Sequence, residues 1–297
     1  MSLSQAKKNP NFIIGGACAG GTSFLSSILK QHKQIFLPKI MRPEPNFFHY
    51  SHKFSKGINS YLKIFKSASK NQIIGERSSL LLTSKKAPLR IKKYFPSIKL
   101  IFCLRNPIER AWANYRFTCL EGLENKTFYN AIKLEKKRKI RNNLYWKEVS
   151  PYSYIERGKY YSSLKLFLKL FKKKNILIIK SEDLSHNTSS QIKKVCSFIG
   201  IKKKFKFKTP ENFTSPMVIN ISKQRELRAK YGRKFYLIIE KIRQKKSLKK
   251  RYNDIKRNLK FSKEPMDNKS RIYLRTIFHK NIKKLSNIID FNTEDWI

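Results

Sequence analysis

A glycine-rich turn near the N-terminus constrains the fold of this chain more than any other segment. The apolar run Phe12-Ile13-Ile14 has the length of a buried strand, and a helical pattern follows Thr22-Ser23, one of which is the predicted N-cap. Four glycines stand between them, at positions 15, 16, 20 and 21. Such a turn points backbone N–H groups and the positive end of a helix dipole at one spot. The segment predicts an α/β fold with an anion-binding turn; a turn without a ligand is the alternative.

The glycine spacing also bears on which anion the turn binds. Gly15, Gly20 and Thr22 fit the nucleotide-binding frame G-x-x-x-x-G-K-[ST], but Gly21 stands where that frame has its lysine. ATPases and kinases of this class use the lysine to hold the β- and γ-phosphates. The turn is therefore suited to phosphate, and a kinase-like reaction is the less favoured reading.

Strands alternate with helical patterns through the first two-thirds of the chain. Further strands are predicted at residues 35–37, 72–75, 99–104 and 175–179. The run KLIFCL at 99–104 is continuously apolar after its lysine, as in a buried parallel strand, and Pro107 begins a helix after it. We predict one α/β domain over residues 1–297, P-loop-like and three-layered, with a central parallel sheet and helices on both faces.

The formal net charge of +48 favours polyanionic partners such as nucleotides, acidic glycans, nucleic acid or membrane surfaces. A biased composition, rich in lysine, asparagine and isoleucine, is the competing explanation. Basic residues crowd residues 223–260, the basic excursion, which we predict to be helical and partly packed. Its helical periodicity rests on Phe235, Leu237, Ile238, Ile239 and Ile242. Because charge runs are usually solvated faces, a nucleic-acid partner is not favoured.

Cysteine usage and hydropathy bear on the compartment. The four cysteines lie far apart, without a CxxC pair or zinc-ligand spacing, which predicts a reducing, cytoplasmic setting and no metal site. The first residues, MSLSQAKKNP, show no signal-peptide core, and no apolar run approaches the length of a membrane span. Nothing in the sequence indicates the oligomeric state.

Arg105 directly follows the predicted strand at 99–104. It stands at the carboxyl end of that strand, where open α/β sheets bind ligands, and a guanidinium there can bind a phosphate with two hydrogen bonds. Arg110 falls one turn into the following helix, and we expect it to form a structural ion pair with Glu109 or a neighbouring acid.

Two further segments carry charged residues that are suited to a catalytic role. Glu44 stands between Pro43 and Pro45 in a stiff loop, and a carboxylate fixed beside a nucleotide suggests a general base. A surface turn is the alternative. Arg77, in Gly75-Glu76-Arg77-Ser78-Ser79, follows the predicted strand at 72–75 and points at the same sheet edge as Arg105. The alternative is that Arg77 is only a charged residue at the end of a strand, without a catalytic role.

Together these segments resemble the sulfotransferases that use 3′-phosphoadenosine 5′-phosphosulfate (PAPS), in particular the branch with heparan sulfate sulfotransferases and bacterial relatives. The family's phosphosulfate loop K-[AGS]-G-T-[TS]-S-L is similar to residues 18–24, and its K-E-P-H-F-F to residues 43–48. Its G-E-K-[ST]-P is similar to residues 75–79, and its L-R-N-P-x-E-R-A-x-S-x-Y to residues 104–115. The resemblance extends to the acidic turn and tryptophan at residues 290–296.

The resemblance implies sulfuryl transfer from PAPS to an acceptor hydroxyl or amine, leaving 3′,5′-bisphosphate product (PAP) and requiring no metal. Arg105 would bind the 3′-phosphate, Glu44 would take the acceptor proton, and Arg77 would share the catalytic role. The implied cofactor-binding residues are Cys18, Ala19, Gly20, Gly21, Thr22, Ser23, Arg105 and Ala113. The acceptor stays open, with the basic charge favouring an acidic saccharide.

Two positions depart from the family pattern. Cys18 replaces the loop lysine, and Ala113 replaces the serine that helps to bind the 3′-phosphate. The missing cation leaves two possibilities: Arg77 or Arg42 supplies the charge, or the enzyme is weak. A non-catalytic nucleotide- or polyanion-binding protein is therefore the alternative from another functional class.

Overall fold

A computed structural model describes residues 8–38, 44–138, 148–201, 205–210, 216–243, 247–261 and 264–296. Internal contacts divide the chain into two compact units. Unit 1 comprises Met1–Asn106, Lys159–Glu211 and Lys280–Ile297; unit 2 comprises Pro107–Gly158 and Asn212–His279. That residues 1–297 form one domain stays a prediction.

Unit 1 is built on a five-stranded parallel sheet with the order β2-β3-β1-β4-β5. The strands are β1 (Phe12–Gly16), β2 (Ile35–Phe36), β3 (Ile73–Arg77), β4 (Lys99–Leu104) and β5 (Ile176–Lys180). All five predicted strands are confirmed to within two residues. The longest difference is in β3, which continues beyond the predicted residues 72–75, so that Glu76 and Arg77 are strand residues.

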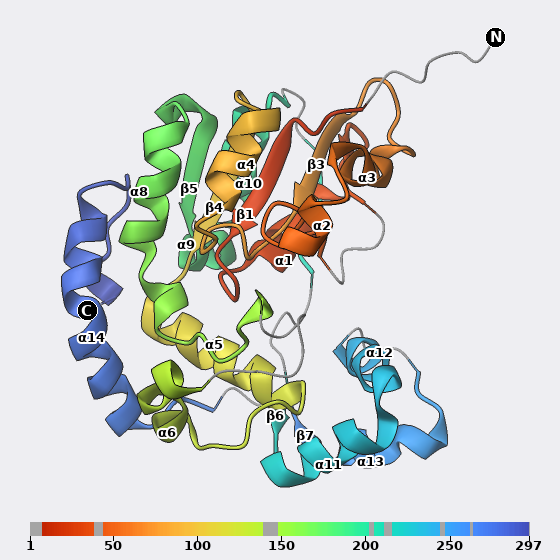
Figure 1. Cartoon of the computed structure of the whole chain (residues 1–297), viewed down its shortest axis with the longest axis vertical. Helices are drawn as coiled ribbons and strands as arrows, with labels where there is room; N and C mark the ends of the chain where they lie inside the picture. The colour runs from red at the N-terminus through yellow and green to blue at the C-terminus, as the bar shows by residue number, and fades with distance from the viewer. Residues whose placement is uncertain are drawn as a thin grey trace. The chain divides into compact units, whose positions relative to one another are not determined.

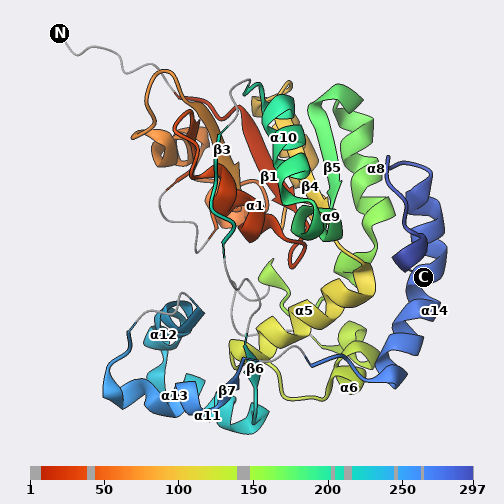
Figure 2. The same ribbon diagram turned by 180° about the vertical axis from the view of Figure 1, so that it is seen from behind.

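Helices cover both faces of this sheet, which confirms the predicted three-layer α/β fold. Helices α1 (Thr22–Leu29) and α10 (Thr188–Ile199) share one apolar core with β1 and β4 on one face (Figure 2). Helices α4 (Ala87–Tyr94) and α8 (Tyr160–Leu170) lie on the opposite face (Figure 1), where the rings of Phe102 and Phe167 meet with centroids 4.8 Å apart. The remaining helices of unit 1 are α2 (Ser51–Phe54), α3 (Ile58–Leu62) and α9 (Ser181–His186).

Unit 2 is mainly helical. Its elements are α5 (Pro107–Leu120), α6 (Phe128–Lys133), β6 (Met217–Val218), α11 (Ile221–Tyr231), α12 (Arg233–Arg243), α13 (Asn253–Arg257) and β7 (Leu259–Lys260). Strands β6 and β7 pair antiparallel. The residues of α14 (Asn268–Ser286) are divided between the two units. Within the described ranges, no helix is both long enough and apolar enough to cross a membrane.

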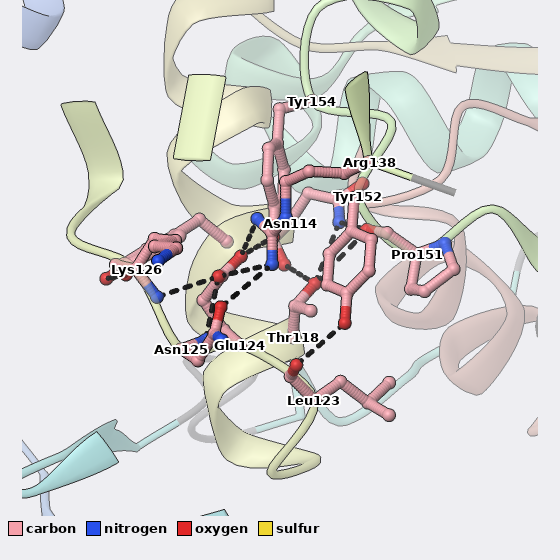
Figure 3. Close-up of polar contacts among 11 residues, drawn as sticks. Asn114, Thr118, Leu123, Glu124, Asn125, Lys126, Arg138, Pro151, Tyr152 and Tyr154 are labelled. Carbon is pink, nitrogen blue, oxygen red and sulfur yellow. Dashed lines mark hydrogen bonds and ion pairs between the residues drawn. The ribbon is translucent and has the colours of Figure 1, made fainter. Parts of the chain in front are cut away.

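A buried carboxylate organises the interior of unit 2 (Figure 3). Glu124 is fully buried and accepts hydrogen bonds from the backbone N–H groups of Asn125 and Lys126, at 2.8 and 3.0 Å. The hydroxyl of Tyr154 donates to it at 2.5 Å, and Arg138 forms an ion pair with it at 2.7 Å. Because every one of these donors faces one carboxylate, the charge of Glu124 is compensated inside the unit.

The basic excursion folds around an apolar core of its own. Phe235, Ile238, Ile239 and Ile242 of α12 are buried with Ile255 of α13, while Leu237 is 60% exposed. The predicted helical periodicity is thus confirmed for four of its five apolar positions. Across its described residues the segment is helical and packed, so the lysines and arginines among them stand on a defined scaffold.

Candidate active site

The glycine-rich turn joins β1 directly to α1. Gly21 is the N-cap of α1, with φ 91°, and no side chain caps the helix. The predicted capping by Thr22 or Ser23 is therefore wrong, because these residues are the first two of the helix itself. Ala19 also has a left-handed backbone, with φ 62°, which tightens the turn.

Two glycines allow this turn to lie against the carboxyl ends of the strands. A Cβ atom on Gly20 would lie 2.5 Å from the carbonyl oxygen of Cys103 in β4. A Cβ atom on Gly21 would lie 2.8 Å from Oγ of Ser181, the first residue of α9. The N–H of Ala17 donates to the Cys103 carbonyl at 2.8 Å, which fixes the turn at this edge. The side chain of Cys18 is partly exposed in the same turn.

Several backbone donors of the turn remain available. The N–H groups of Ala19, Gly21, Thr22 and Ser23 make no hydrogen bond to any part of the chain that the structure describes. The N–H of Gly20 differs, because it donates to the carbonyl of Ala17 at 2.9 Å. These four donors, grouped at the start of a helix, form a site suited to a phosphate or sulfate group.

Arg77 connects this turn to the predicted general base. Its side chain is 4% exposed, and Nη1 donates to the hydroxyl of Ser23 at the start of α1. The same nitrogen lies 3.2 Å from Oε1 of Glu44, whose side chain is 14% exposed. Three residues that the sequence places on separate segments therefore meet through one guanidinium. Arg42 and Pro43 lie outside the described residues.

Ser79 also holds the Glu44 carboxylate, a role that the sequence analysis missed. Both its N–H and its hydroxyl donate to Oε2 of Glu44, each at 2.7 Å. The family pattern G-E-K-[ST]-P has proline at this position, which has no N–H to donate. The serine in place of that proline was the one sign in the sequence that this residue has an additional hydrogen-bonding role.

A second carboxylate lies buried behind Glu44. Glu76 is fully buried in β3 and accepts hydrogen bonds from Ser78 at 2.7 Å and Tyr61 at 3.3 Å. Burial, with a smaller contribution from the charge of Glu44, raises the pKa of Glu76 from 4.5 to about 7. The Ser78 hydroxyl also accepts the N–H of Asn46 at 2.8 Å, which links Glu76 to the segment that carries Glu44.

Arg105 follows β4 at the sheet edge where the turn lies. The hydroxyl of Tyr160 donates to its carbonyl at 2.9 Å, and its guanidinium makes no hydrogen bond or ion pair within the described ranges. Burial raises the pKa of nearby Glu182, and the charge of Arg105 opposes that rise. The side chain of Arg105 is partly exposed and is thus available to a ligand.

Two residues of α5 belong to unit 2. Ala113 is partly exposed there, and its role toward a cofactor stays a prediction. Arg110 is fully buried and donates to Oδ1 of Asn114 at 3.1 Å. Glu109, one of the partners expected for Arg110, instead pairs with Arg271 at 2.8 Å. Across the described residues, no three histidine, cysteine or acidic side chains gather as metal ligands would.

Comparisons of the sequence and of the fold with known proteins both find sulfotransferases. Residues 9–286 match the family model described as "Sulfotransferase domain". Heparan sulfate glucosamine 3-O-sulfotransferase 3B1 from Mus musculus is 27% identical over 202 residues, 68% of this chain and 49% of the relative. Heparan sulfate glucosamine 3-O-sulfotransferase 5 from Mus musculus is 35% identical over 127 residues, 42% of this chain and 36% of the relative. The chain thus spans about half the length of the first of these relatives.

Two solved structures share the fold at low sequence identity. A sulfotransferase from Alicyclobacillus acidocaldarius aligns with TM-score 0.71 and 18% identity, covering 97% of this chain and 99% of that chain. Mouse sulfotransferase SULT7A1, crystallised with PAP, aligns with TM-score 0.51 and 14% identity, covering 93% of this chain and 85% of that chain.

The buried carboxyl group of Glu76 generates a prediction about pH. Because its pKa is about 7 in the folded chain and about 4.5 in the unfolded chain, its stabilising contribution is complete below pH 4.5 and disappears as the pH rises through 7. Glu76→Gln removes this titration. We expect the free energy of unfolding of the variant, relative to the wild type, to rise by up to ~3 kcal/mol over that interval.

Denaturant unfolding of both proteins at closely spaced pH values measures this difference. Subtracting the two curves cancels the titration of groups that do not interact with Glu76, so the remaining change reports Glu76 together with the groups coupled to it. A difference that stays constant from pH 4.5 to 7.5 would contradict the assignment.

Proposed function

The chain belongs to the sulfotransferase domain family, and we propose that it transfers a sulfuryl group from PAPS to an acceptor hydroxyl or amine. The observation that carries this proposal is the contact of Arg77 with both Ser23 and Glu44. It unites a turn suited to an anion, a buried cation and a carboxylate. Those are the three groups that in-line transfer from a phosphosulfate to a hydroxyl requires.

The residues of the turn fit the phosphosulfate of PAPS, which supplies the activated sulfuryl group. The free N–H groups of Ala19, Gly21, Thr22 and Ser23 would hold its 5′ end, with Cys18 and Gly20 completing the turn. A kinase-like reaction fits less well, because the lysine that kinases of this frame require is absent at Gly21. Arg105 and Ala113 would contact the 3′-phosphate, the group that distinguishes PAPS from ATP.

Glu44 is the proposed general base. Its Oε2 is held by Ser79 and its Oε1 by Arg77, so the carboxylate has a fixed orientation. A carboxylate oriented in this way accepts the proton of an attacking hydroxyl as the bond to sulfur forms. No metal takes part in this scheme.

Arg77 is the proposed replacement for the loop lysine that Cys18 displaces. Its guanidinium already reaches Ser23 at the start of α1, beside the free N–H groups of the turn. A cation fixed at this point stabilises the negative charge that develops on the leaving phosphate. Arg42, the other candidate from the sequence, lies outside the described residues.

An acidic saccharide is the acceptor that these observations favour. The curated relatives are named as heparan sulfate glucosamine 3-O-sulfotransferases, and the net charge of +48 suits an anionic glycan. A non-catalytic nucleotide- or polyanion-binding protein is the second candidate, favoured by the loss of the loop lysine at Cys18. A cytoplasmic location, suggested by the four free cysteines, stays a prediction.

Removal of the proposed base tests whether the protein is an enzyme. Glu44→Gln keeps the shape of the side chain but removes its capacity to accept a proton. We expect turnover of labelled PAPS to fall by about 10²–10⁴ with PAP affinity nearly unchanged. Glu294→Gln, at an exposed carboxylate, serves as the control and should retain full turnover. A Glu44→Gln variant with most of its activity would place the base elsewhere, and wild-type protein that binds PAP without turnover would favour the non-catalytic candidate.

Arg105→Ala tests the choice of cofactor. Loss of a charge-assisted contact, worth about 1.5–3 kcal/mol, should weaken PAP binding at least tenfold. Adenosine 5′-phosphosulfate lacks the 3′-phosphate, so its affinity should barely change. Calorimetric titration of both ligands measures the two effects, with Arg275→Ala, at an exposed arginine of α14, as the control. Equal losses for both ligands would overturn the assignment of Arg105.

The source of the missing cation is tested by a pair of variants. If Arg77 supplies the charge, Arg77→Ala should lower kcat by about 10²–10³, the usual effect of removing one transition-state donor. Cys18→Lys should then change kcat by less than about threefold, because a cation is already present. Circular dichroism and PAP binding establish that both variants are folded. An increase in kcat of tenfold or more in Cys18→Lys would show that the loop lysine was lost without replacement.

A further inference from the structure

The basic excursion concentrates positive charge far beyond the level of the remaining chain. Sixteen of the 67 lysines and arginines fall within residues 223–260, which are 38 of the 297 residues. That is about twice the density of the rest of the chain, so a uniform compositional bias does not account for it. The apolar core around Phe235, Ile239 and Ile255 fixes the backbone that carries these charges.

The acids of the excursion leave most of these charges without compensation. Its three acidic residues are each paired locally: Glu226 with Lys223, Glu240 with Arg243, and Asp254 with Lys230. Each of these pairs joins two residues of the excursion itself. Arg228 and Lys260 pair with Glu121 and Glu264, which lie outside the excursion. Among the described residues, the excursion has no further carboxylate for its other cations.

Some of these uncompensated cations surround a cavity of about 440 Å³. We call it the basic cavity; it is lined by Lys241, Ser247, Leu248, Lys249, Arg251 and Tyr252. The three cations of its lining are exposed and form no ion pair with any described residue. Leu248 and Tyr252 pack against the apolar core of the excursion, which gives the cavity a fixed wall.

We propose that the basic cavity binds the anionic groups of an acidic polysaccharide, the acceptor class of the transfer reaction proposed above. This inference rests on the proposed function for the identity of the acceptor. Three cations around a space of this size match sulfate or carboxylate groups on neighbouring sugar units, and the Ser247 hydroxyl adds a hydrogen-bonding group. The residues that line the cavity all belong to unit 2, and the proposal concerns binding by their charges.

The lining favours a polysaccharide over a single-stranded nucleic acid. Single strands are usually bound by stacking of bases on free aromatic rings. Among the described residues of the lining, Tyr252 supplies the one ring, and this ring is already engaged: Arg251 lies over it at 5.0 Å, and the ring of Tyr231 meets it at 5.3 Å. Recognition here rests on charge and hydroxyl groups, which an acidic polysaccharide supplies.

A charge-neutralised variant of the full chain tests the proposal. It combines Lys241→Gln, Lys249→Gln and Arg251→Gln. The control combines Lys63→Gln, Lys70→Gln and Lys174→Gln, three exposed lysines of unit 1, and so makes the same change in net charge. Fluorescence anisotropy with labelled heparin oligosaccharides, at several salt concentrations, measures affinity; neutral dextran and an RNA single strand of equal charge serve as competitors.

The expected result is a loss of heparin affinity of at least tenfold in the cavity variant and less than threefold in the control, with PAP affinity unchanged in both. The dependence of affinity on salt should also weaken in the cavity variant, because fewer counterions are released. Equal losses in the two variants would overturn the proposal, as would competition by dextran. Tighter binding of RNA than of heparin, with the same loss in the cavity variant, would replace the polysaccharide by a nucleic acid.

Failure of the proposed function gives a different result. In one case, PAPS is not turned over and PAP does not bind, yet only the cavity variant loses affinity for heparin. The proposed transfer reaction is then wrong, and the polyanion site stands. If PAPS is turned over and the two variants bind heparin equally, then the reaction stands and the cavity is not its acceptor site.

Discussion

The buried guanidinium of Arg77 is the interaction on which the proposed site depends. A charge that is 4% exposed is costly unless it is paired and hydrogen-bonded, and Arg77 meets both conditions through Glu44 and Ser23. Loss of one partner of such a pair leaves an uncompensated buried charge, which costs about 3–5 kcal/mol. The contacts of Arg77 with Glu44 and Ser23 therefore have two effects. They compensate the buried charge, and they fix the distance between the proposed anion-binding turn and the proposed base.

The geometry of the turn explains why a cation on β3 suits this chain better than one on the turn. Gly21 has a left-handed backbone and lies close to Ser181, so a lysine there, as in the kinase frame, would be strained and would meet a neighbouring side chain. Position 18 carries a partly exposed cysteine in place of the family's lysine, and so lacks that lysine's positive charge. The contacts with Glu44 and Ser23 set the orientation of the Arg77 charge. In the role proposed for Arg77, such a preorganised charge would stabilise the transition state.

The sequence predicted the parts of the fold that depend on local pattern. Continuous apolar runs located the strands, because a parallel strand buried on both faces shows that pattern whatever its neighbours are. The N-cap was predicted wrongly because Thr22 and Ser23 are good capping residues. A glycine is required at position 21 instead, because the backbone there is left-handed and lies close to α9. The bonds from Ser79 to Glu44 join residues 35 positions apart, and no local pattern encodes such a contact. Sequence reasoning named Glu44 and Arg77 but could not show that Arg77 contacts both Glu44 and Ser23.

Glu44 of the proposed site and the buried Glu76 behind it are coupled, and the coupling has a direction. The negative charge of Glu44 is one of the causes that raise the pKa of Glu76, after burial itself. When Glu44 accepts a proton, that contribution disappears, and the buried Glu76 loses one obstacle to ionisation. The hydrogen bonds from Ser78 to Glu76 and from Asn46 to Ser78 connect the Glu44 segment to β3. A buried acid of the central sheet therefore senses the charge of the proposed base.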